Sequence, residues 1–121
     1  VSMDTLTEKE HFVNFDDTDV QAYVVKTKGS WEGKQVYIKP MSGNDRSAMI
    51  DFAKKEKSDA AEHPARVCVR GLCNEKGERI FDNKDFTLLM KRNAEAIQEI
   101  GTAIMDISGL SKEAIEEEEK N

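Results

Sequence analysis

The most constraining feature of the sequence is a regular spacing of isoleucines near its C-terminal end. They recur every three or four residues: Ile97, Ile100, Ile104 and Ile107. Because an α-helix turns once in about 3.6 residues, this spacing places all four on one face. Asn93 can cap the start of such a helix, and Gly109 can end it with Leu110 folded back onto the last turn. The sequence therefore predicts an amphipathic helix between Asn93 and Gly109, with its isoleucine face buried.

Two stretches rich in strand-forming residues lie in the first third of the chain, at 20–27 and 35–39. The segment between them has glycines at positions 29 and 33, which suit a turn, so the pair predicts a β-hairpin with a longish loop. Trp31 lies in that loop. We interpret it as a lid over the apolar face of the hairpin, and the alternative is an anchor for a partner protein.

Shorter helices are predicted between the hairpin and the isoleucine helix. Ser42 and Asp45 have the spacing of an N-cap, for a helix to about residue 57. Residues 65–73 carry apolar side chains at helical spacing, which favours a helix although Gly71 would cost about 1 kcal/mol relative to alanine there. A strand remains the alternative for 65–73, because 74–77 could turn the chain back onto 78–81. Asp82 and Asp85 repeat the N-cap chemistry ahead of a short apolar face at Phe86, Leu89 and Met90.

These patterns together predict a mainly α fold of the α+β class. It consists of a small N-terminal β-hairpin followed by a compact bundle of about four to five short helices. A chain of 121 residues fits one domain, which we place at 20–110. Residues 1–19 are polar and acidic and are predicted to form a flexible N-terminal arm. Residues 111–121 are predicted to form a short helix and an acidic tail.

The net charge and the cysteine content of the chain limit the range of partners and cellular compartments that we expect for it. The net charge of −6 disfavours nucleic acid and anionic membrane surfaces, which both require concentrated basic residues. No stretch approaches the roughly 20 apolar residues of a membrane-spanning helix, and the N-terminus lacks the apolar core of a signal peptide. Cys68 and Cys73 are interpreted as reduced, buried thiols. The expected location is the cytoplasm.

The sequence contains no recognisable catalytic or cofactor motif. His11 and His63 have no nearby histidine or cysteine at zinc-ligand spacing. Phosphate-binding glycine loops and the Gly-x-Ser-x-Gly nucleophile elbow are also missing from the sequence. We therefore expect a protein-binding domain that is not an enzyme and that uses no cofactor or metal ion.

Three segments, taken in order, resemble a known family. They are 31–46 (WEGKQVYIKPMSGNDR), 72–81 (LCNEKGERIF) followed by 82–85, and 104–117 with SGLSKE at its centre. The first resembles the strand-to-helix entry, the second the central acidic turn, and the third the closing helix–turn–helix of tail assembly chaperones of long-tailed bacteriophages. The matches span 31–117, and Ser108 stands where that family would lead us to expect asparagine.

The resemblance implies a protein made in the bacterial host cytoplasm during phage or prophage tail morphogenesis. Such chaperones bind the tape-measure protein, keep its long helices soluble, help to recruit tail-tube subunits without ATP, and are absent from the mature virion. The alternative is a structural head–tail connector or tail-completion protein. Self-association into a homo-oligomer is left open.

An apolar groove on the helices would cover the apolar stripes of a tape measure. The candidate partner-binding residues are Trp31, Phe86, Leu89, Met90, Ile97, Ile115, Glu116, Glu117, Glu118 and Glu119. Packing in the core is the alternative role for the apolar members of this set.

Overall fold

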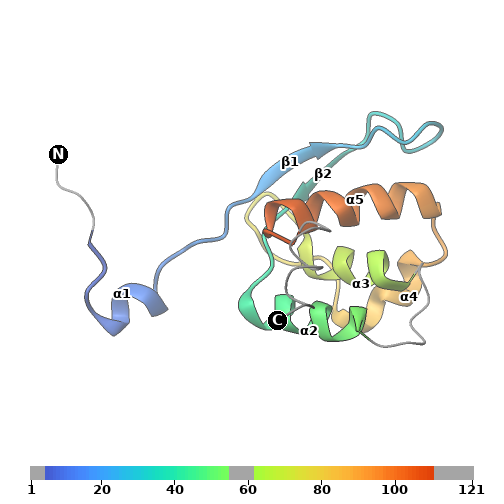
Figure 1. Cartoon of the computed structure of the whole chain (residues 1–121). Coiled ribbons are helices and arrows are strands. Elements are labelled where there is room, and N and C mark those ends of the chain that lie inside the picture. The colour runs from blue at the N-terminus through green and yellow to red at the C-terminus, as the bar shows by residue number, and fades with distance from the viewer. Residues whose placement is uncertain (1–4, 55–61, 111–121) are drawn as a thin grey trace.

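A small antiparallel sheet and a group of short helices make up the fold (Figure 1). The computed structural model describes residues 5–54 and 62–110. Along the chain, the elements are α1 (Lys9–Val13), β1 (Gln21–Val24), β2 (Gln35–Ile38), α2 (Gly43–Ala53), α3 (Glu62–Gly71), β3 (Leu72–Cys73), the 3-10 helix η1 (Asn83–Asp85), α4 (Phe86–Leu89) and α5 (Ala94–Ile107). Helix α3 is central, because α2, α4 and α5 all pack against it. The predicted α+β class is confirmed, and one short helix, α1, precedes the hairpin.

The predicted hairpin is confirmed at β1 and β2. Their register pairs Gln21 with Ile38 and Val24 with Gln35. Two further backbone bonds continue the ladder into the loop, from Val25 N to Lys34 O at 2.8 Å and from Gly33 N to Val25 O at 2.9 Å. Glycine at position 33 is required by its φ of +84°, which other residues rarely adopt.

The helix predicted over 65–73 is correct as far as Gly71 and wrong for the last two residues. Leu72 and Cys73 form β3, which pairs with Ile38 and Tyr37 of β2. Cys73 also forms a bridge with Arg79, so the alternative in which the chain turns back at 74–77 is correct for this short piece. Helical periodicity fails here because the open edge of β2 offers ladder hydrogen bonds that a sequence pattern cannot reveal.

The predicted N-caps are confirmed in α2 and α5. The hydroxyl of Ser42 accepts a hydrogen bond from Asp45 N at 3.2 Å, and Asn93 Oδ1 accepts one from Ala96 N at 3.0 Å. Helix α2 ends at Ala53, and the predicted continuation to about residue 57 runs beyond the described residues.

The C-terminal end of α5 closes as the sequence predicts. Gly109 has a φ of +73°, and its N–H donates to Asp106 O at 3.2 Å. The N–H of Leu110 donates to Met105 O at 2.8 Å, and the Leu110 side chain is buried. This pair of bonds is a Schellman motif, which satisfies carbonyls that would otherwise be unpaired at the helix end.

Helices α3 and α5 approach each other closely, and glycine makes that approach feasible. Ile97, Ile100 and Ile104 are buried, as predicted, whereas Ile107 is half-buried. A Cβ added at Gly71 would lie 2.7 Å from Ile104 Cδ1, and one added at Gly101 would lie 3.2 Å from Pro64 O. The helical cost of Gly71 is therefore offset by close packing.

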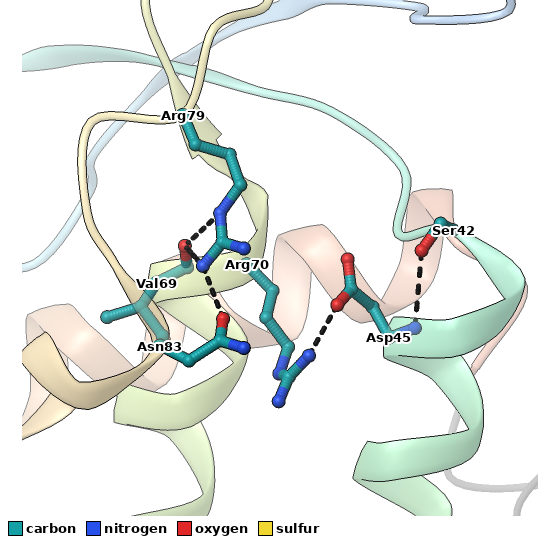
Figure 2. Close-up of polar contacts among 6 residues, drawn as sticks. All are labelled: Ser42, Asp45, Val69, Arg70, Arg79 and Asn83. Carbon is teal, nitrogen blue, oxygen red and sulfur yellow. Dashed lines mark hydrogen bonds and ion pairs between the residues drawn. The ribbon is translucent and has the colours of Figure 1, made fainter.

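Two arginines connect the C-terminal end of α3 to α2 and to η1 (Figure 2). Arg70 forms an ion pair with Asp45, next to the Ser42 cap at the start of α2. The guanidinium of Arg79 donates to Val69 O through Nε at 3.0 Å and Nη2 at 2.7 Å, and Nη2 also donates to Asn83 Oδ1 at 2.6 Å. Arg79 thus satisfies a carbonyl in the last turn of α3 and holds the start of η1 beside it.

The described part of the N-terminal arm extends away from the rest of the molecule at the start of β1 (Figure 1). Every residue from 5 to 19 is exposed, including those of α1. The base of the arm lies against the turn after β3, because a Cβ on Gly77 would be 2.5 Å from Thr18 Cγ2. The helix and acidic tail predicted at 111–121 lie outside the described residues. In the part of the chain that the structure describes, no helix combines the length and apolar character needed to cross a membrane.

Candidate functional site

An apolar cavity of about 300 Å³ lies at the boundary between the sheet and the helices. We call it the sheet-side cavity. It is lined by Trp31, Gln35, Val36, Tyr37, Leu72, Cys73, Ile80, Phe81, Leu89, Ile97 and Ile100. These residues come from the hairpin, β3, the segment before η1, α4 and α5, so the cavity exists only in the folded chain.

A second cavity, of about 250 Å³, lies beside the first, and we call it the helix-side cavity. It is lined by Pro64, Leu89, Met90, Arg92, Ala94, Ile97 and Gln98. Leu89 and Ile97 line both cavities, so the two adjoin at these side chains. The two cavities together are the apolar site.

The short helix α4 and the turn after it position the shared part of the apolar site. Helix α4 ends at Leu89, and the chain tightens there through bonds from Met90 N to Phe86 O at 3.0 Å and from Arg92 N to Leu89 O at 3.0 Å. This turn leaves Leu89 buried and Met90 exposed at the rim of the helix-side cavity. Leu89, which lines both cavities, and Met90, at the rim of the helix-side cavity, are therefore consecutive in the sequence.

Trp31 is held over the sheet-side cavity by the hairpin loop. The loop turns tightly, with Glu32 N donating to Gly29 O at 3.2 Å and Lys34 N donating to Trp31 O at 3.0 Å. The indole is half-buried and packs against the core, which agrees with the interpretation as a lid. Because it also lines the cavity, it stands where a partner anchor would be needed.

Glu99 of α5 fixes the base of the same loop. Its carboxylate accepts hydrogen bonds from Tyr23 Oη at 2.6 Å, Lys26 N at 2.8 Å, and Thr27 N and Oγ1 at 2.9 and 2.6 Å. Burial alone would raise the pKa of Glu99, but the bonds from Thr27, Tyr23 and the backbone outweigh it and lower the pKa to about 2. The bond to Glu99, together with burial, raises the pKa of Tyr23 to about 12. The hairpin loop is thereby attached to α5 by a charged hydrogen-bond cluster.

Cys73 contributes a thiol to the lining of the sheet-side cavity. Burial raises the pKa of this thiol, and the nearby Lys39 only partly opposes the shift. The thiol is therefore neutral at physiological pH and adds to the apolar character of the lining. In the described ranges, 5–54 and 62–110, no three or more potential metal ligands gather closely enough to hold a metal ion.

Exposed apolar side chains extend the site onto the surface. Ile80, which lines the sheet-side cavity, is 55% exposed. Met90 at the helix-side cavity and Leu88 on α4 are also exposed. Exposed apolar side chains beside apolar cavities are typical of binding sites for other proteins or for apolar ligands.

Two of the segments that border the apolar site are basic, whereas α5, which also lines it, carries Glu95, Glu99 and Asp106 and no basic residue. Residues 79–92 contain four basic and two acidic side chains, and the hairpin loop 26–34 contains three lysines and one glutamate. Each segment thus has a net charge of +2. A partner with apolar anchors and acidic flanking residues would suit this border.

The structure brings four of the predicted partner-binding residues together. Trp31, Leu89, Met90 and Ile97 all line the apolar site. Leu89 and Ile97 are also buried in the core, so the predicted alternatives of groove lining and core packing both apply to them.

Phe86 is the exception among the described candidates. Its ring lies beneath the Arg66 guanidinium, 3.8 Å from the ring centroid, and it is not among the residues that line either cavity. The remaining candidates, Ile115, Glu116, Glu117, Glu118 and Glu119, lie outside the described residues.

Sequence reasoning missed the contribution of Ile80 and Phe81 as lining residues. They follow a turn and lie outside any helix or strand, so no periodicity marks them as part of a face. The available signal was an adjacent apolar pair within an otherwise polar segment.

Comparison of the chain with models of known families, with curated proteins and with solved structures found no match. The apolar site and the sequence resemblance are therefore the features that bear on function. What this arrangement can do chemically is to remove apolar side chains of a partner from water.

Proposed function

We propose that this protein is a tail assembly chaperone of a long-tailed bacteriophage or prophage. In this role it binds the tape-measure protein and tail-tube subunits in the cytoplasm of the bacterial host during tail morphogenesis. It is then absent from the mature virion. The sequence resemblance over 31–117 motivates this proposal.

The apolar site is the observation that carries the proposal. A chaperone of this kind must cover apolar side chains that its client would otherwise expose to water. The two adjoining cavities, of about 300 and 250 Å³, provide separate places for two such side chains. Ile80 and Met90 at their edges add apolar surface that remains exposed until a client binds.

The spacing of anchors within the client follows from helix geometry. A helix that lies in a groove presents residues three or four positions apart on one face. We propose that two such apolar residues of a tape-measure helix enter the sheet-side and helix-side cavities. Acidic residues beside them would then face the basic segments 26–34 and 79–92.

In this scheme, recognition of the client is driven only by the free energy of binding. Burying an apolar side chain contributes about 1.5–3 kcal/mol, so two anchors offset much of the cost of association. Moderate affinity suits a chaperone, because the client must leave when the tail tube assembles around it.

Co-expression with the tape-measure protein of the same phage or prophage tests the proposal. Wild-type protein should raise the soluble fraction of the tape measure and co-purify with it. The variant Ile80→Asp/Met90→Asp places charge at the edge of both cavities, and it should weaken binding about tenfold or more. Val24→Asp is the matched control, because Val24 is 50% exposed and is not among the residues lining either cavity.

Two results would count against the proposal. The tape measure could stay equally insoluble with and without this chain, or the Ile80→Asp/Met90→Asp variant could solubilise it as well as the control does. Mass spectrometry of purified virions provides a separate check. A chaperone should be missing from the particles, whereas a head–tail connector or tail-completion protein would remain in them.

A further inference from the structure

The N-terminal arm carries apolar side chains that the body of the protein does not cover. Phe12 is 65% exposed and Phe15 is 57% exposed, and Leu6 and Val13 are exposed beside them. Two exposed phenylalanines within four positions represent a large apolar area for so short a segment. An arm with this composition is a candidate ligand for an apolar site.

The charge of the arm is opposite to that of the hairpin loop and of segment 79–92, two of the segments around the apolar site. Residues 5–19 contain five acidic side chains and one lysine, a net charge of −4. The segments 26–34 and 79–92 each have a net charge of +2. Apolar anchors with acidic neighbours are the partner chemistry that this site favours, and the arm supplies both.

The arm is placed to reach another molecule. Its base lies against Gly77, and the rest extends away from the body at the end of the sheet opposite to the hairpin loop (Figure 1). Residues 5–17 can span at most roughly 45 Å when extended, which is ample for contact with a neighbouring copy.

We propose that the N-terminal arm of one copy binds the apolar site of a second copy. Each copy offers one arm and one site, so reciprocal exchange gives a closed dimer with twofold symmetry. The aromatic ring of Phe12 or Phe15 enters the sheet-side cavity. A volume of about 300 Å³ is sufficient, since an engineered apolar cavity of about 150 Å³ binds benzene. This inference concerns two copies of this chain and does not rest on the proposed client.

Analytical ultracentrifugation of the full chain at low and high concentration tests the exchange. Wild-type protein should shift from monomer to dimer as concentration rises. Phe12→Ser/Phe15→Ser should raise the dimer dissociation constant about a hundredfold, because the contact is lost twice in a symmetric dimer. Val24→Ser should leave the constant unchanged. Circular dichroism checks that each variant is folded, and the arm variant should be, because the substituted side chains are exposed.

A mixing experiment distinguishes arm exchange from any other self-association. The arm variant Phe12→Ser/Phe15→Ser retains an intact site, and the site variant Ile80→Asp/Met90→Asp retains an intact arm. Each variant alone should be largely monomeric, whereas their mixture should form a heterodimer through one remaining arm–site contact.

Three results would overturn the inference. The wild-type chain could remain monomeric at high concentration, which includes the case of an arm that folds onto its own site. The arm variant could dimerise like wild type, which would indicate a different occupant. The mixture could form no heterodimer. None of these results affects the client test, in which the arm variant should solubilise the tape measure as well as wild type does.

Discussion

At the scale of single residues, Gly71 is the position where helix propensity and tertiary packing disagree most clearly. Glycine is a poor helix residue, yet it ends α3 at the point of contact with Ile104 of α5. The space that a methyl group would need is taken by that isoleucine. The choice of glycine therefore depends on a neighbour more than 30 positions away in the sequence.

Substituting Gly71 by alanine should destabilise the protein by about 1–3 kcal/mol, because overpacking exceeds the gain in helix propensity. Gly43→Ala is the matched control, since a Cβ at Gly43 would meet nothing within 4 Å. The control should be neutral or more stable by less than about 1 kcal/mol. Urea unfolding of both variants measures the difference, and equal stabilities would contradict the packing argument.

At the scale of elements, the sheet and α5 are joined by Glu99. One carboxylate accepts bonds from Tyr23 at the end of β1 and from the backbone and side chain just beyond it. Because the pKa of Glu99 falls to about 2 from its ordinary value of 4.5, the folded state favours the charged form. Its contribution to stability is complete above pH 4.5 and is lost as the pH falls towards 2.

Replacing Glu99 by glutamine should lower the free energy of unfolding at neutral pH by about 1–3 kcal/mol, because charged hydrogen bonds are weakened. The variant should also lose less stability than wild type on acidification through the window from 4.5 to 2. Glu95→Gln on the exposed side of α5 should cost less than about 1 kcal/mol, since only a helix-dipole contact changes. Parallel pH profiles for wild type and Glu99→Gln would refute this account.

Elements whose signals are local were predictable from the sequence. The caps at Ser42 and Asn93, the glycine end at Gly109 and the hairpin depend on residues a few positions apart, and all are confirmed. Strand β3 lies in the segment where the sequence favours helix and strand is the alternative, because two residues are too short to show a period. Its existence depends on the free edge of β2, which is distant in sequence.

The candidate site was predictable in part for the same reason. Leu89 and Ile97 lie on helices and Met90 directly follows α4, so their shared apolar character can be read from spacing. Ile80 and Phe81 reach the site from an irregular segment, which Arg79 holds against α3 through Val69 O. That placement depends on a contact that forms only in the folded chain, so no local sequence pattern predicts it.

At the scale of the whole molecule, the buried thiols report whether the core opens as one unit. Cys68 lies between α3 and α5, with its Sγ 3.5 Å from Ile97 O, and is fully buried. Burial raises the pKa of this thiol to about 12, so the native state has little reactive thiolate at moderately alkaline pH. Reagents should reach it only when the helices separate.

Labelling of Cys68 by a disulfide reagent in a Cys73→Ala background should be at least about a thousandfold slower in native protein than in urea, given the usual stability of small domains. Adding Gly71→Ala should accelerate native labelling about tenfold for each 1.4 kcal/mol of lost stability. Rapid labelling of the native protein that is insensitive to Gly71→Ala would show that the thiol is reached by a local movement instead.

The closed end of α5 has a consequence for how this domain can be joined to other sequences. Leu110 occupies the core, and the carbonyls of Ile104, Met105 and Asp106 accept hydrogen bonds from the N–H groups of residues 108–110. The described end of α5 is therefore closed by Gly109 and Leu110, and a reporter protein appended after Asn121 should leave the melting temperature of the domain unchanged. The same property would let a gene encode this domain at the head of a longer polypeptide without any change to its interior.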